Sequence, residues 1–455
     1  MDKSIRSLSE YAHALRYEDF PPQAVHECKR RLIDSVGCAI GAFDAEPSRI
    51  ARAVAERYAG TPSARVFGTL KASSPEHAAF ANGTMLRYAD YNDSYYVKSS
   101  GHPSDTLAAV LAVADAQHAD GKAVITAAML AYESFCNFSD ILPPERGWDY
   151  VIFGVVASAL ASAKLLGLDA EKMAQAISLA VTPNVALEQT RVGELSMWKG
   201  CAAGNAARNG IFAALLAQHG LTGPDDAIEG RSGLQHALGK FEWAPFGGGA
   251  VPFRLTQTHI KYYPAIVHSQ SLIGAAIELH TQVKPADIES VAIETYWVAK
   301  RYTDRAAPLW HPRTRETADH SLAYIAAAAL VDGAITEESF DDERLHDPRI
   351  TALLDKMTIN EKPEYTQKHP ASWPCRIEIT TRAGERKSAF VEYFKGHAKN
   401  PLSDAELEAK FRALTLPFLK PDQIAAVLAK LWNLDQLKDI GEVIELLSVK
   451  RKNAA

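Results

Sequence analysis

The chain has 455 residues, of which 47% are hydrophobic and 23% charged, a composition typical of a globular protein with two or three domains. Its formal net charge is −6 and the only notable basic cluster is the last segment, SVKRKNAA, so the sequence argues against a nucleic-acid partner. Five cysteines lie far apart without a C-x-x-C pair, which argues for a reducing compartment and against an iron–sulfur cluster.

The first part of the chain is predicted to be helical. From Pro22 to about Gly239, Ala, Leu and Ile recur at spacings of three and four residues, as in AARNGIFAALLAQHGLTGP, and the many small residues predict close helix packing. The longest apolar segment, VIFGVVASALASAKLLGL, contains Ser and Lys and is more typical of a buried helix than of a membrane span. Because the N-terminal segment also lacks an apolar signal core, we expect a cytoplasmic protein without a membrane partner.

The pattern changes after Pro264. A helix over HSQSLIGAAIELHTQV precedes ESVAIETYWVAKRYT, whose alternating apolar and polar residues predict a half-buried strand. CRIEITTRAGERKSAFVEYFKGH predicts a hairpin with its turn at 383–385, while ETADHSLAYIAAAALVDG and ERLHDPRITALLDKM are helical patterns. We therefore predict a mainly α protein, with an all-helical domain at 1–266 completed by 398–455 and a smaller α+β domain at 267–397.

The loop YADYNDSYYVKSSGHPSD holds an unusual number of proton donors and acceptors. Ser104 is a plausible N-cap of the helix that follows, and the backbone N–H groups there would bind an anion. His102 lies just before this helix start, where the dipole disfavours its cation and leaves a neutral imidazole that can take or relay a proton. In the structural alternative, Asp90, Asn92 and Asp93 are turn formers and His102 is a capping group.

Three further segments carry ionisable residues at helix starts. Lys199 lies in RVGELSMWKGCAAGNAARNG, where small neighbours would let it reach a carboxylate held against the backbone. Lys261 and His268 lie in THIKYYPAIVHSQS, at the junction of the two predicted domains, a common place for ligand clefts. Each has an alternative as a cap, a salt bridge or a stem packed on an aromatic ring. The last segment, HPRTRETADHSLAYI, contributes Arg313, Arg315, Asp319 and His320, with the same alternatives.

The usual cofactor and nucleophile motifs are missing from the sequence. There is no G-x-x-x-x-G-K-[ST], no H-E-x-x-H, no clustered Cys/His metal set and no G-x-S-x-G, and FGGGAVPF is not a dinucleotide-binding G-x-G-x-x-G. The candidate residues above are then suited to acid–base chemistry on an anion, with no cofactor and no metal.

Read together, five ordered segments resemble the MmgE/PrpD family, which includes 2-methylcitrate dehydratase, cis-aconitate decarboxylase and iminodisuccinate epimerase. They are YNDS with GHPSD, WKGCAAGNAARNG, IKYYPAIVHSQS, RETADHSLAYIAAAALVDG and GHAKNPLSDAELEAKF. The resemblance covers nearly the whole chain. It implies a large all-helical domain built from both chain ends, a smaller α+β lid domain, a homodimer, and an active site in the cleft between the domains.

The resemblance also implies the site residues. As catalytic candidates it gives Asp90, Asp93, His102, Lys199 and Lys261; as substrate-binding candidates we add Asn92, Ser94, Arg191, Tyr263 and His268. Two positions depart from the family pattern. Asp149 in GWDYVIFGVVAS stands where decarboxylase-type members carry histidine, and Ser94 replaces the usual threonine.

The leading hypothesis is a cofactor-independent hydro-lyase that dehydrates a 2-methylcitrate-like tricarboxylate. Dehydration needs a base for the carbon-bound proton, an acid for the hydroxyl and cations for the adjacent carboxylate. Asp93 or His102 would supply the first two, and Lys199 with Lys261 the third. The alternatives are an isomerase, epimerase or decarboxylase acting on a related di- or tricarboxylate, and a non-catalytic anion-binding homologue.

Overall fold

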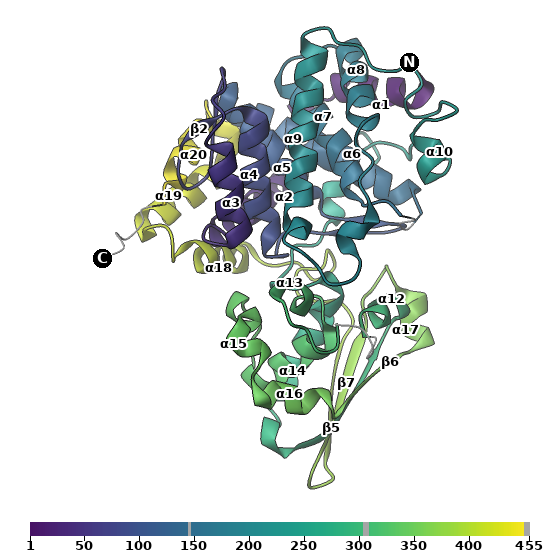
Figure 1. Ribbon diagram of the computed structural model, residues 1–455, viewed down its shortest axis with the longest axis vertical. Helices are drawn as coiled ribbons and strands as arrows, with labels where there is room; N and C mark the ends of the chain where they lie inside the picture. The colour runs from purple at the N-terminus through teal and green to yellow at the C-terminus, as the bar shows by residue number, and fades with distance from the viewer. Residues whose placement is uncertain (144–146, 304–308, 450–455) are drawn as a thin grey trace.

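The computed structural model describes residues 1–143, 147–303 and 309–449. Figure 1 shows a large helical domain with a smaller α+β domain beside it. The larger hydrophobic core takes side chains from residues 5–260 and 402–447, and the smaller core from residues 265–394. The predicted mainly α fold is confirmed. The predicted domain bounds, 1–266 with 398–455 and 267–397, stay a prediction.

The large domain is a layered bundle in which helix α7 is buried along its length up to Ala163. A helix that is apolar on all sides needs neighbours all round, and α7 packs against α6, α8 and α9. The helices of this domain are α1 (Lys3–Ala14), α2 (Pro22–Gly41), α3 (Glu46–Ala55), α4 (Pro75–Tyr88), α5 (Leu107–Ala116), α6 (Gly121–Ile141), α7 (Val151–Leu165), α8 (Ala170–Val181), α9 (Trp198–Gln218) and α10 (Leu234–Leu238), with α18 (Asp404–Thr415), α19 (Pro421–Trp432) and α20 (Gly441–Ile444) from the C-terminal part.

Small residues bring α4 and α9 into close contact. A Cβ atom on Gly204 of α9 would lie 2.6 Å from the Phe80 carbonyl oxygen, and one on Gly83 of α4 would lie 2.8 Å from the Gly204 Cα. Both positions therefore need glycine. This crossing sets the approach of α9, whose first turn carries Lys199, to the end of α4, where the Asp90 loop begins.

The smaller domain has a four-stranded sheet in the order β6-β5-β7-β8, with α11 packed against β7 and β8. β5 pairs parallel with β6 and antiparallel with β7, and β7 and β8 form the predicted hairpin. The strands are β5 (Ile288–Thr295), β6 (Met357–Glu361), β7 (Cys375–Thr381) and β8 (Arg386–Val391), and the helices are α11 (Gln270–His280), α12 (Trp297–Lys300), α13 (Arg315–Ala318), α14 (Leu322–Asp332), α15 (Asp342–Leu345), α16 (Pro348–Leu354) and α17 (Pro363–Lys368).

The range from Pro22 to about Gly239 is helical almost throughout, as expected, apart from loops and two short hairpins, β1 (Ala64–Arg65) with β2 (Ala72–Ser73) and β3 (Tyr95–Tyr96) with β4 (Ser100–Gly101). Two local expectations were wrong. Met357 was assigned to a helix but begins β6, because its side chain is buried in the sheet beside β5. Ser104 is not an N-cap: it lies inside the 3-10 helix η2 (Pro103–Thr106), and α5 starts only at Leu107.

The C-terminal helices return to the large domain, where α18 and α19 both pack against α2 (Figure 1). All five cysteines are buried and free. Within the part of the chain that the structure describes, no helix combines the length and the apolar character needed to cross a lipid bilayer.

Candidate active site

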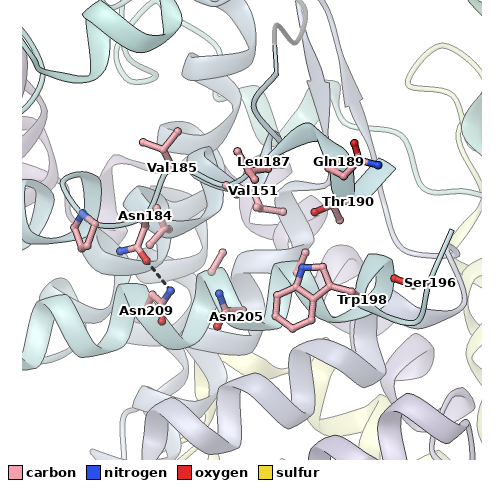
Figure 2. A pocket seen from close by; sticks show the side chains of 15 residues that line it. Val151, Asn184, Val185, Leu187, Gln189, Thr190, Ser196, Trp198, Asn205 and Asn209 are labelled. Atoms are coloured by element: carbon pink, nitrogen blue, oxygen red, sulfur yellow. Dashed lines mark hydrogen bonds between the residues drawn. The ribbon is translucent and has the colours of Figure 1, made fainter. Parts of the chain in front are cut away.

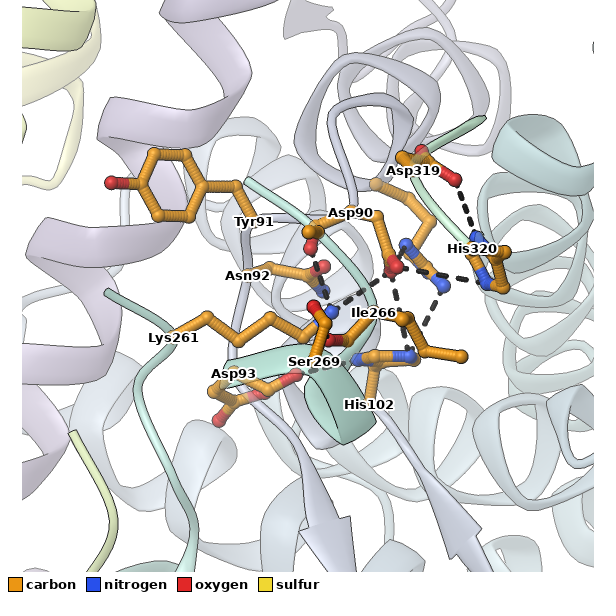
Figure 3. A network of polar contacts seen from close by, with 12 residues as sticks. Asp90, Tyr91, Asn92, Asp93, His102, Lys261, Ile266, Ser269, Asp319 and His320 are labelled. Atoms are coloured by element: carbon orange, nitrogen blue, oxygen red, sulfur yellow. Dashed lines mark hydrogen bonds and ion pairs between the residues drawn. The ribbon is translucent and has the colours of Figure 1, made fainter. Parts of the chain in front are cut away.

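A buried carboxylate, Asp90, lies at the centre of a polar cluster (Figure 3). It directly follows the C-cap of α4 and has φ 50°, a left-handed conformation that aspartate tolerates better than most residues. Its carboxylate forms an ion pair with Arg87 and lies 3.0 Å from the Lys261 Nζ. The Nε2 atom of His102 lies 3.8 Å from Oδ1 of this carboxylate, and the Nε2 atom of His320 lies 3.8 Å from Oδ2. Two cations and two imidazoles therefore surround one acid.

The charges in this cluster favour an ionised Asp90. Burial alone would raise its pKa, but the charges of Arg87 and Lys261 outweigh burial and hold that pKa well below its ordinary value. Burial lowers the pKa of Lys261 to about 8, although Asp90 opposes the shift. Lys261 also donates to the Asp90 backbone carbonyl at 2.6 Å. Its ammonium group is thus both fixed in place and a better proton donor than an exposed lysine.

His102 is held as a neutral imidazole. Its Nδ1 lies 2.6 Å from the Asp93 carbonyl oxygen, to which it donates, and its Nε2 accepts from Arg87 Nη2 at 3.1 Å. Burial, then Arg87 and Lys261, lower its pKa well below the ordinary value. The neutral form expected from the sequence agrees with these contacts, though its cause is burial beside two cations.

Asp93 faces away from the cluster and caps η2. One carboxylate oxygen accepts from the Ser104 backbone N–H at 3.0 Å, and the other accepts from the Tyr132 hydroxyl at 2.7 Å. The side chain is fully buried, and burial raises its pKa despite these hydrogen bonds. The N–H that was expected to bind an anion is thus taken by the chain's own carboxylate. These contacts favour Asp90 over Asp93 as the reacting acid.

Asn92 and Ser94 belong to the support of this loop. The Asn92 Nδ2 donates to Ser104 Oγ and to Asp105 Oδ1, both at 2.9 Å. The Ser94 N–H donates to the His259 carbonyl at 2.9 Å, which ties the loop to the segment that carries Lys261. Burial raises the pKa of Asp105 to about 7. The loop is therefore a hydrogen-bonded scaffold with Asp90 at its start.

A lysine of α18 supports the backbone of the Asp90 loop and of the Lys261 segment. Lys410 Nζ donates to the carbonyls of Tyr91 at 2.9 Å and Lys261 at 2.8 Å, and lies 2.6 Å from the Asp34 carboxylate. All of these groups are buried or nearly so. One cation from the C-terminal part thus fixes the two segments that present Asp90 and Lys261.

The second lysine links the two domains. Lys199, in the first turn of α9, lies 3.1 and 3.2 Å from the carboxylate oxygens of Asp319 in the smaller domain, and 3.1 Å from His320 Nδ1. Asp319 and His320 also form a short side-chain hydrogen bond. Burial lowers the pKa of Lys199, against the effect of Asp319. Burial alone would raise the pKa of Asp319, but Lys199 and His320 together outweigh burial and lower that pKa.

Arg191 lies beside Lys199 with one donor unused. Its Nε lies 3.2 Å from an Asp149 oxygen, its guanidinium stacks 4.8 Å above the Tyr150 ring, and its Nη1 donates to the Lys199 carbonyl at 3.5 Å. Among the described residues, its buried Nη2 has no hydrogen-bond partner. A buried guanidinium donor without a partner is suited to a carboxylate.

His268 and Tyr263 do not join the Asp90 cluster directly. The two ring nitrogens of His268 contact the hydroxyls of Tyr296 at 2.7 Å and Tyr96 at 3.1 Å. Tyr263 is half-buried, and its backbone N–H donates to Gln270 Oε1 at 3.1 Å. Both residues lie on the segment that joins the domains.

Sequence reasoning did not select Arg87, Asp319 or His320 as site residues. Arg87 was hidden in the regular helical pattern of α4. Asp319 and His320 were noted at a helix start, but nothing in that pattern showed that they reach Asp90 from the other domain.

Ligand-type atoms of Asp90, Asp319 and His320 lie within 4.8 Å of one another. Lys199 and Lys261 already pair with the two carboxylates, so we assign no cation there; the absence of a metal stays a prediction.

A separate pocket of about 490 Å³ lies against α7 and α9 (Figure 2). Ser196 and Trp198 border it near Lys199, and Asn184 and Asn209 form a 2.7 Å hydrogen bond in its wall. No residue of the Asp90 cluster lines this pocket, so the pocket lies next to the cluster and is distinct from it.

Comparison with known proteins gives consistent matches over most of the chain. Residues 6–244 match the MmgE/PrpD N-terminal domain and residues 263–434 the MmgE/PrpD C-terminal domain. The chain is 30% identical to 2-methylcitrate dehydratase of Cupriavidus necator, over 96% of each protein, and 30% identical to that of Escherichia coli K12, over 88% of this chain and 86% of the relative. It is 27% identical to human cis-aconitate decarboxylase, over 98% and 95%. With both family models matched in order around this buried cluster, the chain belongs to the MmgE/PrpD family.

Proposed function

We propose that the protein is a lyase that removes water from a 2-methylcitrate-like tricarboxylate without a cofactor. The observation that carries the proposal is the Asp90 cluster, in which an ionised acid, neutral imidazoles and buried cations meet where the domains join. The names of the relatives from Cupriavidus necator and Escherichia coli support the same reaction class.

The cluster offers each group that dehydration needs. Lys199 and Arg191 would bind carboxylates of the substrate, and a charge-assisted hydrogen bond to each would stabilise the negative charge that builds up when the carbon-bound proton leaves. Lys261, whose pKa is lowered to about 8, would give a proton to the departing hydroxyl. Asp90 and His102 would hold and relay protons beside it. Asp93, Asn92 and Ser94 would act by fixing the loop.

Asp149 supports dehydration over decarboxylation. Its carboxylate pairs with Arg191 3.2 Å away, so this position sets the orientation of a cation. A histidine there could not supply the same fixed negative charge.

A homodimer is part of the proposal. The segment 185–198 beside the pocket of Figure 2 exposes several large apolar side chains, a pattern typical of protein contact surfaces. They are Val185, Leu187, Val192, Met197 and Trp198, with exposed fractions from 40% to 67%. Leu187→Glu should convert a dimer to a monomer in sedimentation equilibrium if a second copy covers this segment.

The decisive experiment incubates the purified protein with a panel of tri- and dicarboxylates. Alkene absorbance reports dehydration, and proton NMR in D₂O separates loss of water from loss of carbon dioxide and from epimerisation. Water loss from a 2-methylcitrate-like acid is the expected result. Carbon dioxide release, or deuterium exchange without an alkene, would move the assignment to a decarboxylase or an epimerase.

A further inference from the structure

The smaller domain brings His320 to the Asp90 cluster, and the proposed function gives this histidine no role. His320 lies in the turn between α13 and α14. The carbonyl of Asp319 accepts from the Ile266 backbone N–H at 2.9 Å, and the hydroxyl of Ser321 caps α14 by accepting from the Tyr324 N–H at 3.1 Å. The turn is fixed on both sides of His320, so its imidazole has a defined direction.

The contacts of the ring assign its tautomer. Nδ1 lies in hydrogen-bonding contact with Asp319 and 3.1 Å from Lys199 Nζ. Lys199 has both oxygens of the ionised Asp319 carboxylate as acceptors, so we assign the Nδ1 contact with Asp319 as the one that carries the ring proton, which leaves the lone pair on Nε2. Among the described residues, Nε2 takes part in no hydrogen bond, and it lies 3.8 Å from an Asp90 oxygen. The side chain keeps an exposed fraction of 14%, so it is within reach of a small molecule.

His102 differs from His320 in this respect. Its Nδ1 donates to the Asp93 carbonyl, and its Nε2 lone pair accepts from Arg87. Both nitrogens of His102 are therefore engaged, whereas His320 presents a free lone pair to the same carboxylate. In serine hydrolases the general base is likewise a histidine that an aspartate orients at Nδ1, and its Nε2 lone pair takes the proton.

We infer that His320, oriented by Asp319, is the general base of the site and that the smaller domain supplies it. The inference rests on the proposed dehydration. Nε2 takes the proton from the carbon next to a substrate carboxylate, and the electron pair of that C–H bond becomes the second bond of the alkene. The C–O bond breaks, and the hydroxyl takes a proton from the Lys261 ammonium and leaves as water. The imidazolium then returns its proton to the Lys261 amine, which restores both groups.

The test uses His320→Ala in the full chain, with turnover and deuterium exchange into the substrate measured with and without added imidazole. The expected result is a loss of about 10²–10⁴-fold in kcat, with partial recovery when imidazole enters the space left by the ring. His346 is exposed on the same domain, and its Nδ1 contacts only the Asp342 carbonyl among the described residues. His346→Ala is the matched control and should behave as wild type.

Two outcomes with His320→Ala would overturn the inference alone. Turnover by His320→Ala within about threefold of the wild-type rate would show that His320 is not the base, and it would leave the proposed function intact. A folded His320→Ala that has lost activity but gains none from imidazole would make the ring a positioning residue. If His320→Ala melts early, His320→Gln keeps a donor for Asp319 and fills the space, and must lose activity without rescue. Wild-type protein that neither dehydrates nor exchanges any acid of the panel would instead defeat the proposed function, and the inference with it.

Discussion

Each domain forms one wall of the site, and the two walls are held in place by different kinds of contact. In the large domain, main-chain oxygens fix the reacting groups: Lys261 donates to the Asp90 carbonyl and His102 to the Asp93 carbonyl. In the smaller domain, the side-chain hydrogen bonds that Asp319 accepts from described residues come from His320 and from Lys199 across the domain boundary. The first wall is complete within its own domain, and the second becomes complete only when the domains meet.

The strongest way to test this comparison is to change the two neighbouring aspartates separately. Asp90→Asn removes the charge that Arg87 and Lys261 share, so kcat/KM should fall by about 10²–10⁴-fold. Asp93→Asn should mainly destabilise, by about 1–3 kcal/mol, because an amide cannot accept from both Ser104 and Tyr132 as the carboxylate does. Activity per folded molecule and urea unfolding separate the two effects. Equal activity losses in both variants would contradict the assignment of Asp93 as a cap.

Removing the lysine that bridges the domains should have the next largest effect. Lys199→Met leaves Asp319 buried without its cation, which typically costs about 3–5 kcal/mol, and it removes a proposed carboxylate partner. We expect kcat/KM to fall by roughly thirty- to a hundredfold, the size of one charge-assisted hydrogen bond of about 2–3 kcal/mol.

The matched control for Lys199→Met is Lys362→Met, which breaks the exposed 3.1 Å pair with Glu294. It should change stability by about 1 kcal/mol or less. Unchanged activity in Lys199→Met would remove this lysine from the site.

Acid should destabilise the folded protein through two partly or fully buried histidines. Burial lowers the pKa of His369 and of His397 to about 4, the latter with help from Lys399. Below about pH 6.5 the unfolded chain binds protons at these histidines that the folded protein does not, so stability is complete above that pH and falls toward pH 4. Urea midpoints at pH 7.5 and 5 measure the loss, and His369→Gln should reduce it. A midpoint that rises on acidification would contradict the buried neutral histidines.

Chelation should have the smallest effect. Lys199 and Lys261 already neutralise the carboxylates of Asp319 and Asp90, so prolonged treatment with EDTA should leave turnover intact. An activity loss that added metal restores would show that a cation, in place of these lysines, holds the two walls together.

Much of the fold follows from local pattern. The period-two alternation of β5 and the hairpin of β7 and β8 were correctly predicted because one face of each strand is buried. β6 was missed because a five-residue strand after a helical pattern carries too little signal of its own.

The candidate site was only partly accessible from sequence. The family motifs selected Asp90, His102, Lys199 and Lys261, which the structure places in or beside one cluster. The motifs did not show that Asp90 faces the cluster and Asp93 does not, because this difference depends on the left-handed turn at Asp90. His320 meets Lys199 across 121 positions of sequence, a contact that no local pattern encodes.

The position of Lys410 has a consequence for the order in which the site forms during synthesis. The loop of Asp90 and the segment of Lys261 emerge from the ribosome well before α18, yet their carbonyls share the Lys410 ammonium as donor. A nascent chain that has made both segments still lacks this support until α18 docks against α2. Catalytic competence should therefore appear late and abruptly during translation, and chains stalled before residue 404 should be inactive even when the N-terminal helices have folded.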